Sequence, residues 1–290
     1  LENFFQGWIQ RTADELDMRA GQFLKKTKTW YNGYKFHPES EKVYNPFSCL
    51  KLFENREFSN WWFETGTPSF LIKLIQEKQL EPPGLECRQV GRKAFSLFDV
   101  EQADVVPLLL QTGYLTIRDY EDELYTLDYP NLEVRKSFLT SLAEVFSHQP
   151  GGDLEAFIIR MLKALKKSDI NSFFNILIAL IAGVPYQLHL PDERYYHSLF
   201  YLIFRLLGIT IRAEESSSQG RLDAIIELEN GIWIFEFKYK GTAQSAISQI
   251  REKGYAAPYR TDPRPVHLVG VNFDPEKRNI QEWTVEEISQ

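Results

Sequence analysis

The chain is poor in cysteine and has no long apolar run, and both shortages exclude classes of protein. Its 290 residues include two cysteines, Cys49 and Cys87, with no CxxC pair and no zinc-type spacing to histidine. This excludes a disulfide-stabilised scaffold and leads us to expect a reducing, cytoplasmic location. The longest apolar stretch, 173–184, is interrupted by Asn175 and Gly183. It is shorter than the roughly 18 residues of a membrane span, so we expect no membrane association.

An excess of basic residues is also missing. Lys and Arg total 33 against 40 Asp and Glu, which gives a formal net charge of -7. This balance argues against a protein that holds nucleic acid mainly by bulk charge, but it does not exclude an enzyme that binds a phosphodiester locally through metal ions. The hydrophobic fraction of 43% is enough for a sizeable core. The length predicts about two domains, and a first residue of Leu rather than Met predicts a fragment or a reading frame cut upstream.

Residues 1–83 show mostly helical patterns broken by aromatic turns. The apolar residues of 69–78 recur on one helical face, and Asn45 or Ser48 is placed to cap a short helix that follows. The Glu-Pro-Pro-Gly sequence at 81–84 is the clearest breaker in this half of the chain, and it predicts a domain boundary there.

The next region, residues 84–149, is predicted to hold a helix, a hairpin and a second helix. The helix covers 105–111, the hairpin 113–128, and the second helix begins after the capping residue Asn131. This order is compatible with a winged-helix module. Residues 150–184 are predicted to be a largely helical connector.

From residue 185 to 290 the pattern changes to that of an α/β domain. Amphipathic helical segments are separated by short runs with strand-type alternation. The predicted order is helix 192–207, strands 209–214, 221–228 and 232–240, helix 242–255 and strand 266–272.

Two carboxylates and a lysine interrupt the apolar strands of this domain. Side chains alternate along a strand, so Glu236 and Lys238 share one face while the aromatic residues at 233, 235, 237 and 239 occupy the other. If the two strands pair through the short turn between them, Asp223 lies near both. The plain alternative is an exposed strand face with a Glu–Lys pair.

Such groups are costly to bury without a purpose. Carboxylate oxygens are the ligands that Mg²⁺ prefers, and the ion can hold a phosphodiester and lower the pKa of a water molecule. A lysine beside it can orient that water or stabilise charge.

Asp223 followed by Glu236-Phe237-Lys238 resembles the PD-(D/E)XK nuclease signature. Further segments are similar to bacterial proteins that join an AAA-ATPase-like domain to a C-terminal PD-(D/E)XK domain. These segments are aromatic turns in the first half and polar or aromatic runs in the second: 30–34, 44–48, 62–68, 185–186, 195–197 and 249–255.

The resemblance implies a restriction-endonuclease-like core of α-β-β-β-α-β order that uses Mg²⁺ or Mn²⁺. It assigns metal binding to Asp223 and Glu236 and a catalytic role to Lys238. It also implies that residues 1–83 are a helical remnant of the ATPase-like region. The chain contains no G-x-x-x-x-G-K-[ST] sequence, so ATP binding is not expected.

Three further residues are candidates for supporting roles. Glu193, in the helix before the first strand, would lie near the metal in related folds, or is a first-turn glutamate favoured by the helix dipole. Gln249 and Tyr255 would position the nucleic acid backbone, as in some nucleases of this superfamily, or serve helix polarity and core packing.

These observations lead to two functional hypotheses. The first is a divalent-metal-dependent nuclease that hydrolyses DNA, with RNA as an open alternative. The second is a catalytically inactive nuclease-fold module that binds nucleic acid or regulates an ATPase partner. The oligomeric state is left open.

Overall fold

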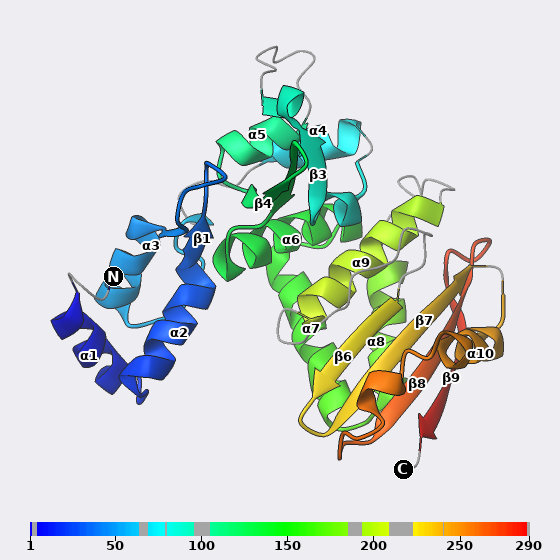
Figure 1. Ribbon diagram of the computed structural model, residues 1–290. Helices are drawn as coiled ribbons and strands as arrows, with labels where there is room; N and C mark the ends of the chain where they lie inside the picture. Colours follow the sequence, from blue (N-terminus) through cyan, green and yellow to red (C-terminus); the bar gives the residue numbers. More distant parts are fainter. Residues whose placement is uncertain are drawn as a thin grey trace. The chain divides into compact units, whose positions relative to one another are not determined.

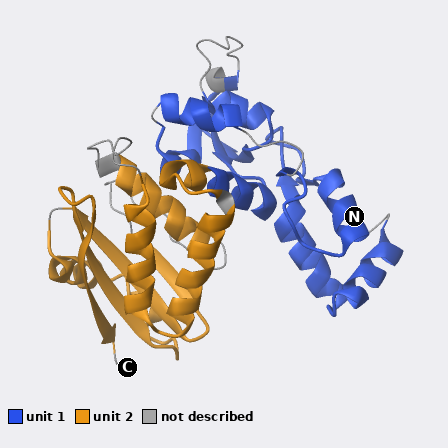
Figure 2. Cartoon of the chain, turned by 180° about the vertical axis from the view of Figure 1, so that it is seen from behind, with its two compact units in different colours: residues 1–141 blue, residues 142–290 orange. Residues whose placement is uncertain are grey.

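The computed structural model divides the chain into two compact units, residues 1–141 and 142–290 (Figures 1 and 2). It describes residues 1, 5–63, 69–78, 80–95, 105–184, 193–208, 223–239 and 241–288. Within these ranges, no helix is long and apolar enough to cross a membrane.

The first unit begins with a small helical core. Helices α1 (Gln6–Glu15), α2 (Ala20–Tyr31) and α3 (Pro46–Asn55) pack around one cluster of buried side chains. The side chain of Asn45 accepts hydrogen bonds from the backbone N–H groups at 47 and 48, which confirms one of the two predicted caps. The buried members of the cluster are Ile9, Ala13, Phe23, Tyr31, Cys49, Leu52 and Phe53.

Two small antiparallel sheets complete the strands of this unit. Strands β1 (Asn32–Tyr34) and β2 (Val43–Tyr44) pair with each other. The second sheet has the order β3-β5-β4 and contains the predicted hairpin. Its strands are β3 (Arg88–Gly91), which the sequence pattern did not reveal, β4 (Thr116–Glu121) and β5 (Leu124–Asp128).

Three helices and two short 3-10 turns accompany the second sheet. The predicted order of helix, hairpin and helix is present as α5, β4–β5 and α6, and the winged-helix assignment stays a prediction. The elements are α4 (Ser69–Glu77), η2 (Pro82–Leu85), η3 (Arg92–Phe95), α5 (Val105–Gln111) and α6 (Leu132–Ser147), the last of which contains the border between the two units.

A buried carboxylate connects the aromatic turns to α6. Glu133 is fully buried, and the hydroxyl of Ser48 donates to its two oxygens at 2.9 and 2.8 Å. The backbone N–H of Trp62 donates to Oε1 at 2.8 Å. Burial raises the pKa of Glu133 from its ordinary value of 4.5 to about 7, although both hydrogen bonds lower it.

The second unit is a four-stranded sheet with helices on both faces. Its strands have the order β6-β7-β8-β9, with β7 and β8 parallel and the outer pairs antiparallel. Helices α7, α8 and α9 cover one face and α10 the other (Figures 1 and 2). The bounds are α7 (Gly151–Lys166), α8 (Ile170–Ala182), α9 (Glu193–Gly208), β6 (Asp223–Leu228), β7 (Gly231–Tyr239), α10 (Ala243–Lys253), η5 (Ala257–Tyr259), β8 (Val266–Asp274) and β9 (Asn279–Ile288).

Comparison with the predicted order shows where the pattern was informative. The described part contains α9, β6, β7, α10 and β8 in the predicted sequence, whereas the predicted strand 209–214 lies outside the described residues. Strand β9 was not predicted. Residues 150–184, predicted as a connector, form α7 and α8, which break at 167–169 and belong to the second unit.

The turn between β6 and β7 is attached to the end of α7. Leu228 pairs with Gly231, so the turn has two residues, and the second of these is Asn230. Its side-chain amide donates to the carbonyls of Leu165 at 3.2 Å and Lys166 at 3.0 Å. These carbonyls belong to the last turn of α7, and that of Leu165 also accepts from the backbone N–H of Ser168 at 2.9 Å.

The raised pKa of Glu133 predicts a pH-dependent stability. The folded state holds a proton between about pH 4.5 and 7 that the unfolded state releases, so the free energy of unfolding falls by about 3 kcal/mol as the pH rises through this window. Glu133→Gln should remove this loss. Urea titrations of both proteins at pH 5 and pH 8 measure the difference, and equal pH dependence in the two would contradict it.

Candidate active site

Strand β7 presents aromatic residues to one side and aliphatic residues to the other, as its alternation predicted. The ring of Phe235 lies 5.5 Å from that of Phe173 on α8, and Phe237 lies 4.9 Å from Phe200 on α9. Ile232 and Ile234 belong to the opposite cluster, which includes residues of α10. Glu236 and Lys238 occupy the next alternate positions of β7, so they lie on the same face of the sheet as Ile232 and Ile234.

The register of β6 and β7 places the two acidic positions side by side. Residue 223 pairs with Glu236 across the antiparallel ladder. Directly opposed positions in such a ladder share one sheet face. The strand pairing that we predicted from the short turn is therefore confirmed. The side chains of Asp223 and Glu193 lie outside the described ones.

Glu236 is a fully buried carboxylate beside a lysine. Its exposed fraction is 0%, and its Oε1 lies 3.8 Å from the Nζ of Lys238. The Lys238 side chain is 20% exposed. The alternative of an exposed strand face with a Glu–Lys pair is therefore wrong, because α10 lies over this part of the sheet.

A close approach of α10 to β8 produces this burial. Gly270 pairs with Glu236 in the parallel ladder, and a Cβ atom at position 270 would overlap the carbonyl oxygen of Ala243. The first turn of α10 thus lies directly on the sheet, beside the acidic position. Glycine has no Cβ atom and therefore allows the two backbone segments to approach this closely.

Gln249 links α10 to the lysine. It is buried, with 7% of its surface exposed, and its Oε1 accepts a hydrogen bond from the Nζ of Lys238. Its Nε2 is buried and has no hydrogen-bond partner among the described residues. Of the predicted supporting residues, Gln249 thus contacts Lys238, and its Nε2 amide group can still donate a hydrogen bond to a ligand.

Tyr255 lies beyond the end of α10 rather than on it. The helix ends at Lys253, and Gly254 adopts the left-handed conformation of a C-cap with φ of 67°. Tyr255 packs against the isoleucine-rich cluster of β6, β7 and α10, with the ammonium of Lys253 at 5.3 Å from its ring. The predicted helix was therefore too long by two residues.

The sequence pattern missed one polar residue of this region. Asn272 is buried on β8 at the position that pairs with Lys238. Its Oδ1 accepts from the backbone N–H of Gly241 at 2.9 Å, and its Nδ2 donates to Gln281 at 3.1 Å. An asparagine within an apolar strand was the available signal, and its role is to hold the loop that leads from β7 into α10.

The donor chemistry of this region suits a hard divalent cation. Mg²⁺ usually takes one or two carboxylates and keeps several waters. A buried carboxylate at 236 opposite an aspartate position offers this kind of donor set. Within the described side chains, no group of three or more His, Cys, Asp and Glu lies close enough to hold an ion.

The strands and helices just described can be compared with known families. Residues 191–283 match the family model of the PD-(D/E)XK nuclease superfamily. The match covers α9, β6, β7, α10, β8 and half of β9, so it includes all three residues of the predicted signature. The superfamily assignment predicted for the C-terminal domain is confirmed at this level.

One curated relative is similar over most of the chain. It is described as "Uncharacterized protein in vnfD 5'region" from Azotobacter chroococcum mcd 1 and is 35% identical over 272 residues. The alignment covers 90% of this chain and 52% of the relative, so the chain spans about half the length of that protein. No solved structure gives a significant match.

The packing of α10 on β8 in the nuclease-superfamily domain gives a stability prediction. Gly270→Ala forces a methyl group against the Ala243 carbonyl and should lower the free energy of unfolding by about 3 kcal/mol. Gly91→Ala, on strand β3, is the matched control because nothing lies within 4 Å of an added Cβ there. Thermal melts of the two variants compare them. Equal midpoints would show that α10 does not approach β8 this closely.

Proposed function

We propose that the nuclease-superfamily domain hydrolyses phosphodiester bonds of DNA with Mg²⁺ or Mn²⁺ held by Asp223 and Glu236. One observation carries the proposal. A completely buried carboxylate lies opposite the aspartate position and 3.8 Å from a lysine, within a stretch that matches this superfamily. A buried charge of this kind is a functional-site candidate, because structural stability alone does not favour it.

Each residue has a distinct role in this proposal. The bound ion would supply a Lewis acid at the phosphate and lower the pKa of an attacking water. Lys238 stabilises the negative charge that develops on the phosphate oxygens during in-line displacement. Gln249 fixes the lysine through Oε1, and its buried Nε2 donates to a phosphate oxygen.

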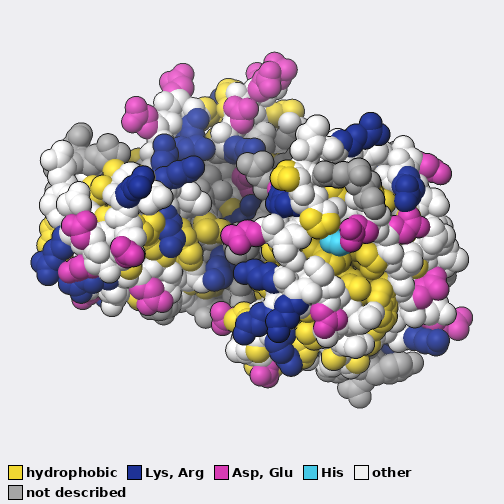
Figure 3. Space-filling model, turned by 90° about the horizontal axis from the view of Figure 1, so that it is seen from below, with side chains coloured by type: hydrophobic (Ala, Val, Ile, Leu, Met, Phe, Trp, Pro, Cys, Tyr) yellow, Lys and Arg dark blue, Asp and Glu magenta, His cyan; other side chains and the backbone are white. Residues whose placement is uncertain are grey.

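Recognition of nucleic acid would then be local. On the face shown in Figure 3, basic and acidic side chains of the described residues both reach the surface, and the chain has a net charge of -7. Binding would therefore depend on the ion, on Lys238 and on a few further contacts rather than on bulk charge.

The first half of the chain enters the proposal through its aromatic segments. We propose that residues 1–83 correspond to part of an AAA-ATPase-like region. Because the chain contains no phosphate-binding loop sequence, this region would not bind ATP. The competing hypothesis is that the domain is catalytically inactive and binds nucleic acid without cleaving it.

Single-turnover cleavage of labelled single- and double-stranded DNA, with RNA in parallel, tests the function. Asp223→Asn, Glu236→Gln and Lys238→Ala should each lower the rate in Mg²⁺ or Mn²⁺ by roughly a hundredfold or more. Lys238→Arg should not restore it fully, since a planar fork cannot replace a compact ammonium. Lys163→Ala, an exposed lysine on α7, is the control and should cleave like the wild type.

Two outcomes would contradict the proposal. A wild type that binds DNA but cuts nothing with any metal would favour the inactive module. A Lys238→Ala protein that cuts normally would place the activity elsewhere. Because Lys238 is mostly buried and bonded to Gln249, circular dichroism of each variant must accompany the rates.

Metal binding has a readout that does not require turnover. An ion that binds the folded state stabilises it by about 2.7 kcal/mol at a concentration of one hundred times Kd. For a unit of this size the melting midpoint should rise by roughly 5 to 10 °C. Asp223→Asn should abolish the rise. Differential scanning calorimetry with Mg²⁺, Mn²⁺ and EDTA measures it, and an unchanged wild-type midpoint would argue against an intact metal site.

A further inference from the structure

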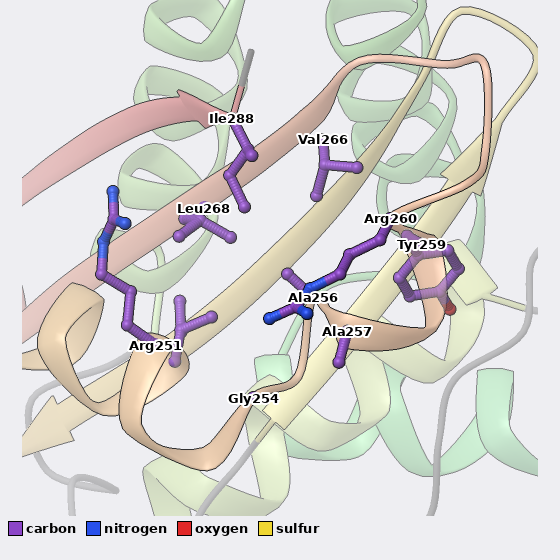
Figure 4. A pocket seen from close by; sticks show the side chains of 10 residues that line it. Arg251, Gly254, Ala256, Ala257, Tyr259, Arg260, Val266, Leu268 and Ile288 are labelled. Carbon is purple, nitrogen blue, oxygen red and sulfur yellow. The ribbon is translucent and has the colours of Figure 1, made fainter. Parts of the chain in front are cut away.

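A hollow of about 460 Å³ opens on the α10 side of the sheet (Figure 4). Its floor is apolar: Ile288 of β9 is partly exposed there, and Val266 and Leu268 of β8 and Ile250 of α10 are buried beneath it. The rest of its lining comes from Arg251 of α10, from the turn after this helix, and from η5 with Arg260 directly after it. A concave apolar surface of this volume has the dimensions of small-molecule sites.

The wall formed by η5 is firmly attached to the sheet. The hydroxyl of Tyr259 donates to Glu227 of β6 at 3.1 Å. Just beyond η5, Arg264 binds Glu227 at 3.2 Å, Asp262 at 2.6 Å and the carbonyl of Leu228 at 3.0 Å. The hollow is therefore preformed, so a ligand would not have to order this segment on binding.

The two arginines of the lining differ in their partners. Arg251 turns away along α10 and pairs with Glu286 of β9 at 2.5 Å. Arg260 reaches across the mouth toward Ala256 (Figure 4). Its guanidinium is exposed and makes no hydrogen bond or ion pair with another described residue. An apolar floor beneath an available guanidinium is complementary to an anion that carries a flat apolar body.

We propose that this hollow is a nucleotide subsite, in which a base lies against the partly exposed Ile288, Ala256 and Tyr259 and the attached phosphate binds Arg260. The choice of a nucleotide over other amphipathic anions rests on the proposed function, since a nuclease meets this anion in its own substrate. Tyr259 borders the base, and Arg260 forms a paired hydrogen bond to the phosphate.

The hollow and the acidic position lie on the same face of the sheet, at opposite ends of α10. Val266, Leu268 and Gly270 occupy alternate positions of β8 and so share one face, and Gly270 pairs with Glu236. Helix α10 contributes to both places, because Ile250 lines the hollow while its neighbour Gln249 holds Lys238. Because α10 covers the sheet between the two places, a nucleic acid strand with one nucleotide in the hollow would have to pass around this helix to reach the carboxylate.

The test measures binding in EDTA, where no metal-dependent turnover occurs. Deoxyadenosine monophosphate, adenosine and inorganic phosphate are titrated into the full chain with labelled methyl groups. We expect the monophosphate to shift the methyl signals of Val266, Leu268 and Ile288, and to bind about tenfold or more tightly than either fragment. Equal binding of inorganic phosphate, or shifts confined to other methyl groups, would overturn the proposal. A preference for an acidic peptide would do the same.

Two variants and a control sharpen the result. Arg260→Glu should weaken monophosphate binding by about tenfold or more through charge reversal, and Ala257→Trp, at an exposed position of the wall, should block the hollow without disturbing the core. Lys163→Glu, an exposed charge reversal on α7, should bind like the wild type. Unchanged binding in Arg260→Glu would overturn the proposal.

The outcomes separate this inference from the proposed function. If the monophosphate occupies the hollow but no DNA is cleaved, the nucleotide subsite stands and the nuclease proposal fails. If DNA is cleaved through Lys238 but Arg260→Glu binds and cleaves as the wild type does, the nuclease proposal stands and the subsite fails.

Discussion

The contact between the first turn of α10 and Gly270 of β8 determines the geometry of the nuclease-superfamily domain. The carbonyl of Ala243 lies where any larger residue would place its Cβ. From this contact α10 extends over β7 and β8, which buries Glu236 and brings Gln249 to Lys238. Two polar groups hold the start of the helix in place. Asn272 binds the backbone at 241, and Glu282 of β9 accepts from the backbone N–H of Ala243 at 2.8 Å.

Among the described side chains, two carboxylates are completely buried, and their surroundings differ. Glu133 of the first unit receives hydrogen bonds from a hydroxyl and a backbone N–H, both neutral donors. Its burial ties distant segments of one unit together, and a neutral amide could take over that task. Glu236 instead lies beside a cationic side chain, opposite a second acidic position. Neutral replacement there would remove the charge that a cation requires.

The candidate site was more predictable from the sequence than the sheet that carries it. The predicted strands 221–228 and 232–240 were joined by a short turn, so position 223 was expected near Glu236 and Lys238. The turn has two residues rather than the three predicted, and this register sets position 223 opposite Glu236. The alternation of aromatic and other residues along β7 likewise predicted which of its side chains share one face of the sheet. Strand β9 was not predicted because it is an edge strand, in which Glu282, Glu286 and Glu287 interrupt the apolar residues. The role of Asn272 was not predicted because its hydrogen-bond partners come from a loop and from β9, which only the fold brings together.

The covering helices of the second unit set a lower limit on the piece of chain that can fold. Helix α8 contributes Phe173 and Phe174 to the aromatic layer, and Phe174 stacks on Trp283 of β9 at 4.7 Å. A protein cut to the matched stretch 191–283 would therefore uncover the side of Phe235 that packs on α8 and would lose the second half of β9. We expect such a fragment to aggregate through the apolar surface that it exposes. We therefore expect that a fragment able to fold must include α7 and extend through β9.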